Sequence, residues 1–246
     1  MKAALEKIEA ALKECPDDTD ALRVKSMILA SLDRTAEAAL VLEELVEHEP
    51  DDLDIRYILG RVYCKLELWE KAVIHLEKSL ESPNRTKDAR ELLVSCYEKT
   101  GKPAKAIPLL EAILKENPGD SVLITQMGNL QLGTREYTAA RRSFRAAIDI
   151  NPKLLQAYEG LAVSNALLEK YGETEKVLTE AIVQFPREPG FRIRLAETYL
   201  KLGRPLDALT VIEQLKGLTG ETKQIELLRN AAATILKAQG KLVPPK

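Results

Sequence analysis

The sequence lacks the motifs by which most enzymes are recognised. Its 246 residues include two histidines and three cysteines. There is no His-Glu-x-x-His, Cys-x-x-Cys, Gly-x-Ser-x-Gly or phosphate-binding loop. The run Thr100-Gly101-Lys102 lacks the preceding glycine of a phosphate loop, so we assign it to a turn. We therefore predict that the chain is not an enzyme and binds no cofactor and no metal ion.

Long apolar runs and excess basic charge are also absent. No segment approaches the roughly 18 uncharged apolar residues that span a bilayer, and residues 1–7 lack the apolar stretch of a signal peptide. The net charge is −2, whereas nucleic-acid-binding domains are usually strongly basic. Cys15, Cys64 and Cys96 show no disulfide or metal spacing, which fits a reducing compartment. These features predict a cytoplasmic protein that binds neither nucleic acid nor a small-molecule substrate.

The chain does contain a repeat. Proline returns at helix exits such as Glu49-Pro50-Asp51-Asp52 and Asn117-Pro118-Gly119-Asp120. Prolines 16 and 50, 118 and 152, and 152 and 186 are each 34 residues apart. The member missing from this series falls at Asn84, with Pro83 one residue early. A fixed period of this length indicates an array of one supersecondary unit.

Each unit is predicted to hold two amphipathic helices joined by a short polar turn. The units start at Thr19, Leu53, Lys87, Ser121, Leu155 and Pro189. A mostly small residue recurs at position 8 (Ser26, Gly60, Val94, Gly128, Ala162, Ala196) and another at position 20 (Ala38, Ala72, Ala106, Ala140, Thr174, Ala208). Small residues let the two helices approach closely, and larger residues at positions 11 and 24 fill the space around them.

These rows resemble the tetratricopeptide repeat family over residues 19–220, although the tryptophan of that family at position 4 is absent. The resemblance implies an all-α, right-handed superhelical solenoid of six stacked antiparallel helix pairs. Residues 1–16 read as the second helix of a truncated repeat, residues 221–239 as a C-terminal capping helix and residues 240–246 as a disordered tail. The half-repeat is interpreted as the mark of an excised fragment or as a natural start, and it offers a surface for self-association.

The resemblance also implies that the first helices line a concave groove, with positions 2, 5, 6, 9, 12 and 13 facing into it. Met27, Ile58 and Val163 are among these positions. The residues expected to bind a partner are Arg23, Tyr57, Arg61, Glu91, Ser95, Gln126, Asn129, Glu159, Arg194 and Glu197. Polar side chains mixed with a few apolar ones suit an extended peptide or a helix of a partner protein. The chain is therefore predicted to be a non-catalytic protein-interaction scaffold.

Other interpretations stay open. The alternative function is a component of a bacterial envelope-assembly, polysaccharide-export or secretion complex, periplasmic or membrane-attached if the chain is a fragment. The basic cluster Arg141, Arg142 and Arg145 is either a solvated helix face or a dock for an acidic partner or anionic membrane. The acidic residues of segment 17–54 either occupy helix N-termini, where negative charge is favourable, or form an acidic surface that docks to a partner.

Overall fold

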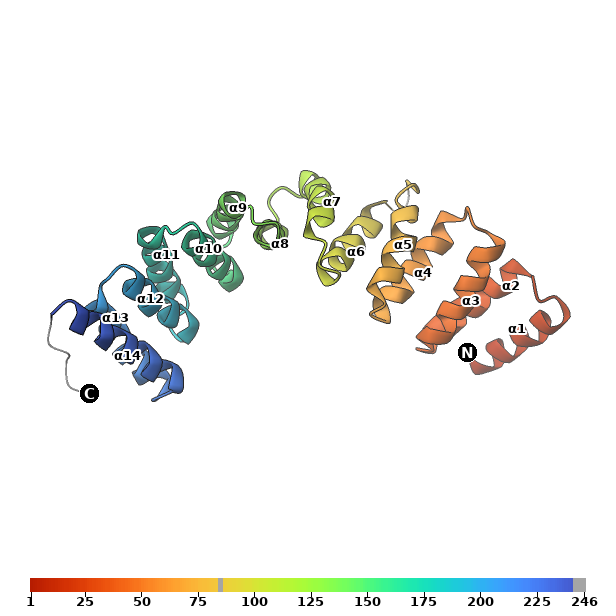
Figure 1. The fold of residues 1–246 in the computed structure, drawn as a ribbon. Coiled ribbons are helices and arrows are strands. Elements are labelled where there is room, and N and C mark those ends of the chain that lie inside the picture. The colour runs from red at the N-terminus through yellow and green to blue at the C-terminus, as the bar shows by residue number, and fades with distance from the viewer. Residues whose placement is uncertain (84–85, 241–246) are drawn as a thin grey trace. The chain divides into compact units, whose positions relative to one another are not determined.

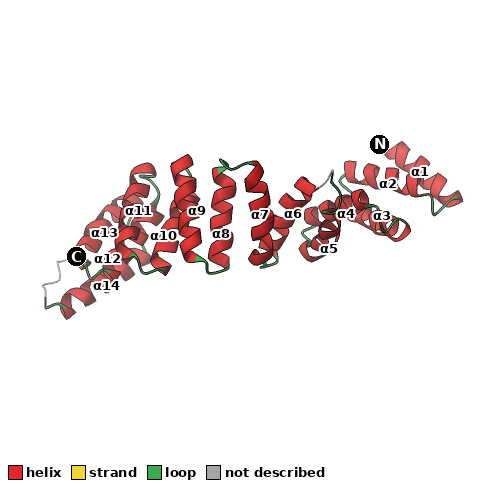
Figure 2. Cartoon of the chain, turned by 90° about the horizontal axis from the view of Figure 1, so that it is seen from above, coloured by secondary structure: helices red, strands yellow, loops and turns green. Residues whose placement is uncertain are grey.

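The computed structural model describes residues 1–83 and 86–240, and its regular elements are α-helices (Figures 1 and 2). They are α1 (Lys2–Glu14), α2 (Thr19–Ser31), α3 (Thr35–His48), α4 (Leu53–Lys65), α5 (Trp69–Ser79), α6 (Thr86–Lys99), α7 (Pro103–Glu116), α8 (Ser121–Gly133), α9 (Tyr137–Ile150), α10 (Leu155–Leu167), α11 (Tyr171–Gln184), α12 (Pro189–Lys201), α13 (Pro205–Thr219) and α14 (Lys223–Ala238). Asn84 and the expected tail from residue 241 onward lie outside the described residues.

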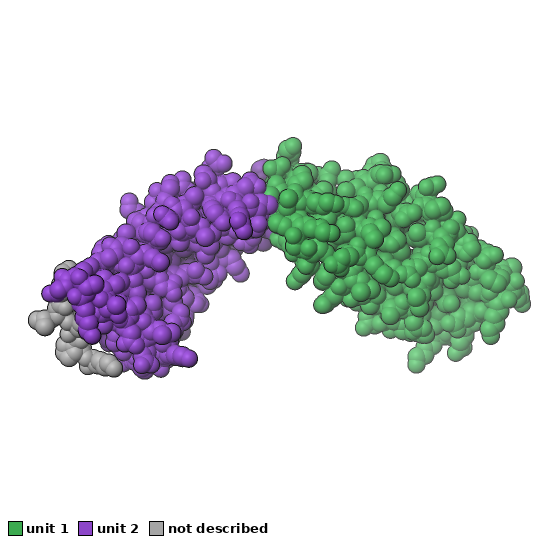
Figure 3. All heavy atoms as spheres, in the orientation of Figure 1, with its two compact units in different colours: residues 1–117 green, residues 118–246 purple. Residues whose placement is uncertain are grey.

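The helices belong to two compact units, which are coloured separately in Figure 3. Unit 1 comprises residues 1–117 with α1 to α7, and unit 2 comprises residues 118–246 with α8 to α14. Inside each unit every helix packs against the next one along the chain. First helices also contact one another, α4 with α6 and α8 with α10. The predicted all-α repeat of helix pairs is therefore confirmed.

Acidic residues cap the first helices of several repeats. The Asp18 carboxylate accepts a hydrogen bond from Ala21 N, Asp52 accepts from Asp54 N and Ile55 N, and Asp120 accepts from Val122 N and Leu123 N. A short side chain at this position satisfies backbone N–H groups that have no partner within the helix. The helix-capping interpretation of the acidic repeat starts is therefore supported at Asp18 and Asp52.

The turn inside each helix pair places position 15 in the left-handed backbone region. Gly101 and Gly203 occupy it with φ of 66° and 69°, and Pro103 and Pro205 begin the next helices as predicted. In the other repeats the same position holds Asp33 (φ 60°), Glu67 (φ 58°), Arg135 (φ 64°) and Glu169 (φ 57°). This conformation is unfavourable for a side chain with a Cβ, so the packing of the helix pair, not the local residue, determines the turn.

Close helix packing depends on the two rows of small residues. The position 20 residues are 0% to 2% exposed, and Gly60 and Gly128 at position 8 face large side chains of the second helix. A Cβ on Gly128 would lie 2.7 Å from the ring of Phe144, and one on Gly160 in the next repeat would lie 2.3 Å from it. Phe144 is fully buried between these two glycines.

A hydrogen-bonded triad links successive repeats in unit 1. The hydroxyl of Tyr63 on α4 donates to Glu43 on α3, and Lys71 Nζ on α5 lies 3.2 Å from the same carboxylate. One repeat later, Tyr97, Glu77 and Lys105 form the same arrangement. The lysines also lie over the tyrosine rings, 5.2 Å and 5.5 Å from their centroids. Position 11 therefore contributes a junction bond in addition to the packing that the sequence predicted.

The first helix buries a different residue from the one that the repeat positions suggest. In α1, Leu5 is buried against the following helix, whereas Ala4 and Ala11 are exposed. Ala4 occupies position 20, which in the later repeats packs against the first helix of the same pair. Among the described residues α1 packs against α2, and Ala4 lies on its exposed face.

Candidate functional site

Each unit contains a pocket between the first helices of two adjacent repeats. In unit 2 the α10–α12 pocket has a volume of about 320 Å³. Its walls are formed by Ala162, Val163, Ala166, Leu167, Tyr171, Thr174, Arg194, Glu197, Thr198 and Lys201. In unit 1 the α2–α4 pocket has a volume of about 480 Å³. Its walls are formed by Ser26, Met27, Ala30, Thr35, Leu42, Ile58, Arg61, Val62 and Lys65.

The two pockets occupy equivalent places in the repeat. Both use positions 8, 9, 12 and 17 of one repeat and positions 6, 9, 10 and 13 of the next. The small side chains at positions 8 and 12 (alanines 162 and 166, Ser26 and Ala30) leave the space open. The pocket is therefore a property of the repeat, and its chemistry is set by the residues at a few positions.

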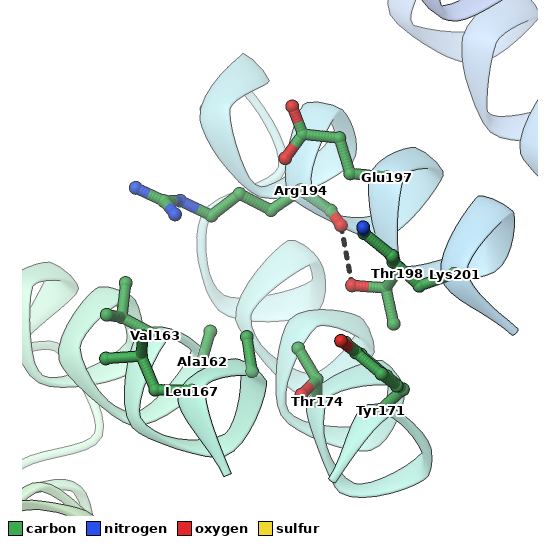
Figure 4. A pocket seen from close by; sticks show the side chains of 10 residues that line it. Ala162, Val163, Leu167, Tyr171, Thr174, Arg194, Glu197, Thr198 and Lys201 are labelled. Atoms are coloured by element: carbon green, nitrogen blue, oxygen red, sulfur yellow. Dashed lines mark hydrogen bonds between the residues drawn. The ribbon is translucent and has the colours of Figure 1, made fainter. Parts of the chain in front are cut away.

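The α10–α12 pocket has an apolar interior and a charged rim. The hydroxyls of Thr174 and Thr198 donate to the backbone oxygens of Lys170 (3.0 Å) and Arg194 (2.7 Å), so both are satisfied within their own helices. Figure 4 shows Val163 and Leu167 on the α10 side and Arg194 and Glu197 on α12.

The rim of this pocket consists of exposed charged side chains. Arg194, Glu197 and Lys201 are all solvent-exposed, and none forms an ion pair with another described residue. The rim carries two cations against one carboxylate, and these charges are available to a ligand.

The charged side chains at the rim of the α2–α4 pocket already contact other residues. Met27 is 66% exposed beside it. The Arg61 guanidinium lies 5.6 Å from the ring centroid of Tyr57, and Lys65 Nζ lies 2.5 Å from the Asp33 carboxylate. Because Lys65 already has an acidic partner, a ligand carboxylate gains less here than at the α10–α12 pocket.

All ten predicted binding residues lie on first helices, five in each unit. The structure brings Arg61 together with Met27 and Ile58 in the α2–α4 pocket. It brings Arg194 and Glu197 together with Val163 in the α10–α12 pocket. The other predicted residues line neither pocket: Arg23, Tyr57, Glu91, Ser95, Gln126, Asn129 and Glu159.

Two of these residues, Arg23 and Tyr57, form contacts where consecutive repeats of unit 1 meet. Arg23 Nη2 lies 2.6 Å from the Glu49 carboxylate and 3.0 Å from that of Asp52. Although burial opposes ionisation, the Ile55 N–H and the Arg23 guanidinium hold the pKa of Asp52 below its usual value. Tyr57 is only 5% exposed, and its hydroxyl lies 3.5 Å from Asp88 on α6. Their contacts connect consecutive repeats.

The remaining predicted residues are accessible on their helices. Glu91 and Ser95 are exposed on α6, where the Ser95 hydroxyl donates to the Glu91 backbone oxygen at 3.3 Å. Asn129 is exposed on α8, and Gln126 and Glu159 are half-buried on α8 and α10. Sequence reasoning missed Ala162, Tyr171 and Thr198, because positions 8, 17 and 10 were assigned to packing or to no role.

The basic cluster on α9 borders a separate hollow of about 420 Å³. Arg141 Nη1 lies 2.6 Å from Glu173 on α11, and Arg145 Nη1 lies 3.2 Å from Glu180 on the same helix. Two of the three arginines are therefore paired with carboxylates of the neighbouring repeat, which favours the interpretation as a solvated helix face over docking to an acidic partner.

No group of three or more histidine, cysteine, aspartate or glutamate side chains within residues 1–83 and 86–240 is arranged to hold a metal ion. In the same part of the chain, no helix has the length and apolar character to cross a bilayer.

Comparisons with known proteins agree with the helix pairs. The family model "Anaphase-promoting complex, cyclosome, subunit 3" matches residues 31–113, and the model "Tetratricopeptide repeat" matches residues 97–162. Over an alignment of 125 residues that covers 48% of the chain, it is 31% identical to human Tetratricopeptide repeat protein 21B. The mouse protein of the same name is 28% identical over 125 residues. The match spans only 9% of the length of these relatives.

Solved structures share the fold. A tetratricopeptide repeat protein from Parabacteroides merdae matches with a TM-score of 0.60 and 22% identity, over 91% of this chain and 87% of that one. YrrB, described as a repeat protein with an unusual peptide-binding site, matches with a TM-score of 0.61 and 22% identity over 74% and 94% of the two chains. MamA from Desulfovibrio magneticus RS-1 matches with a TM-score of 0.57 and 20% identity over 68% and 95%.

The fold thus defines the chain as an all-α helical repeat solenoid. More specifically, the repeat spacing, the family models and the relatives identify it as a tetratricopeptide repeat protein. This family is generally a non-catalytic scaffold fold.

Proposed function

We propose that the chain is a scaffold that binds an extended peptide of a partner protein along the first helices of unit 2. An apolar side chain of the peptide enters the α10–α12 pocket, and an adjacent acidic side chain contacts Arg194 or Lys201. The observation that carries this proposal is the pocket itself, an apolar hollow of about 320 Å³ rimmed by two cations that have no ion pair with another described residue.

The size and chemistry of the pocket favour a peptide as the occupant. Recognition of an extended segment needs one apolar anchor and polar groups that fix its register. The pocket supplies the anchor site at Ala162 and Ala166 and the polar groups at its rim. A solved structure with the same fold is described as having a peptide-binding site, which supports the same class of ligand. The envelope-assembly and secretion alternative stays a prediction, because no feature of the described residues favours it.

A displayed library of random peptides tests the proposal with the whole chain immobilised. The two test variants are Ala166→Phe, which fills the pocket, and Arg194→Glu, which reverses a rim charge. Matched controls are Ala231→Phe on the exposed part of α14 and Arg187→Glu in the turn before α12, neither of which lines the pocket. Circular dichroism verifies that all four variants are folded.

We expect enrichment of peptides in which an apolar residue neighbours Asp or Glu. Their affinity should fall at least about tenfold for both test variants, since a lost anchor or a reversed charge costs on the order of 1.4 kcal/mol or more. The control variants should bind as the wild type does. Peptides that bind all variants equally, or no enrichment over an uncoated surface, would contradict the proposal.

A further inference from the structure

Two cysteines that lie far apart in the sequence meet inside unit 1. Cys64 on α4 and Cys96 on α6 place their sulfur atoms 3.3 Å apart. They occupy positions 12 and 10 of successive repeats, so neither their spacing nor their repeat position indicated a pair. The stacking of the two first helices, which contact each other directly, brings them together.

The two thiols differ in access and in acidity. Cys96 is fully buried and Cys64 is half-buried. The third cysteine, Cys15, is exposed and directly follows α1. A hydrogen bond joins the two sulfur atoms, and it lowers the pKa of the Cys64 thiol. The same hydrogen bond, together with burial, raises the pKa of Cys96. Cys64 is therefore the thiol with the greater thiolate character, and Cys96 is held against it.

We propose that Cys64 and Cys96 form an oxidisable dithiol site that reacts with a hydroperoxide and closes to an intramolecular disulfide. The Cys64 thiolate attacks the terminal peroxide oxygen, the O–O bond breaks, and the leaving oxygen takes up the proton released by Cys64. This step leaves a sulfenic acid on Cys64. The sulfur of Cys96 then attacks the sulfur of Cys64, the S–O bond breaks, and hydroxide leaves as water with the Cys96 proton.

The reaction is balanced and needs little movement. Two thiols lose two electrons and two protons, and one molecule of hydrogen peroxide is reduced to two of water. The sulfur atoms must close from 3.3 Å to the disulfide bond length of about 2.05 Å. The disulfide would fix α4 to α6, close in sequence to two of the predicted binding residues: Arg61 lies one turn before Cys64, and Ser95 is next to Cys96.

Peptide mapping of the whole chain tests this site directly. The reduced protein is treated with one equivalent of hydrogen peroxide, blocked with N-ethylmaleimide and digested with trypsin without reduction. Cleavage after Lys and Arg places the three cysteines in separate peptides, residues 14–23, 62–65 and 91–99. The expected product is peptide 62–65 joined to peptide 91–99, with peptide 14–23 recovered as the maleimide adduct.

Two variants assign the roles of the thiols. In Cys96→Ser, the sulfenic acid on Cys64 should persist and be trapped by dimedone. In Cys64→Ser, Cys96 should stay reduced, because it is buried and its thiol is the less acidic one. A circular dichroism spectrum of each variant confirms folding. The proposal is overturned if Cys15 oxidises as fast as Cys64, if wild-type Cys64 proceeds to the sulfinic acid without crosslinking, or if Cys96 reacts equally well in Cys64→Ser.

Discussion

The substitution Gly160→Ala is expected to destabilise the chain, although alanine is the better helix former. A Cβ at residue 160 would lie 2.3 Å from Cζ and 2.4 Å from Cε1 of Phe144. The ring has no free direction of escape, because a Cβ at Gly128 would lie 2.7 Å from it and Phe144 is fully buried. The ring or the helices must therefore shift.

The expected magnitude follows from two opposing effects. Overpacking a filled core costs roughly 1–3 kcal/mol, whereas replacing glycine by alanine inside a helix gains about 1 kcal/mol. Because the ring is held on both sides, we take the upper part of the first range and expect a net loss of about 1–2 kcal/mol in the free energy of unfolding. Urea denaturation followed by far-ultraviolet circular dichroism measures it.

A control and a rescue make the test specific. Gly217→Ala on α13 meets no heavy atom within 4 Å, so it should leave stability unchanged or raise it by up to about 1 kcal/mol. Adding Phe144→Leu to Gly160→Ala should recover part of the loss, since the pair Leu42 and Ile58 shows that leucine at position 24 accommodates a larger residue at position 6. If Gly160→Ala is as stable as the wild type, or if the two substitutions are strictly additive, the steric reasoning is wrong.

Two further predictions concern the repeat junctions. The hydrogen bonds from Tyr63 and Tyr97 lower the pKa of Glu43 and Glu77 below the ordinary value of 4.5. The stability that these hydrogen bonds confer is therefore fully present above pH 4.5 and is lost as the pH falls through the lowered pKa. The double variant Tyr63→Phe/Tyr97→Phe should therefore show a shallower loss of stability on acidification below 4.5, as measured by urea midpoints across a pH series, and an unchanged acid limb would contradict this role. Asp52→Ala should lower the free energy of unfolding by about 1–2 kcal/mol and Asp120→Ala by about 1 kcal/mol. Both aspartates cap a helix, but only Asp52 also pairs with Arg23. Equal losses in urea denaturation would show that the Arg23 contact contributes nothing.

The sequence predicted the helices because their determinants are local and repeated. The small residues at position 20, the capping residues Asp18, Asp52 and Asp120 and the Gly-x-Pro turns at Gly101 and Gly203 each have the same role in the repeats where they occur. Features that depend on two adjacent repeats were harder to predict. The sulfur contact between Cys64 and Cys96 and the bond from Tyr63 to Glu43 join different repeat positions, and their geometry follows only once the helices are stacked.

The candidate site was predicted in part for the same reason. Family geometry selected Arg61, Arg194 and Glu197, and the structure places all three at pockets. Family geometry could not predict which neighbouring first helices leave a pocket between them, because the pocket depends on the sizes of the residues at positions 8, 12 and 17 together. Nor could family geometry predict that Arg23, at position 5 of the first repeat, pairs with Glu49 and Asp52.

The position of Phe144 between Gly128 and Gly160 limits how the repeats can be exchanged in protein engineering. An insertion, deletion or consensus replacement that cuts between α9 and α10 would separate the ring from one of the glycines that make room for it. A large residue arriving at position 6 would then meet the ring, and a smaller residue at position 24 would leave a void. In this part of the chain the exchangeable module therefore extends from Gly128 to Gly160, across the boundary between two repeats.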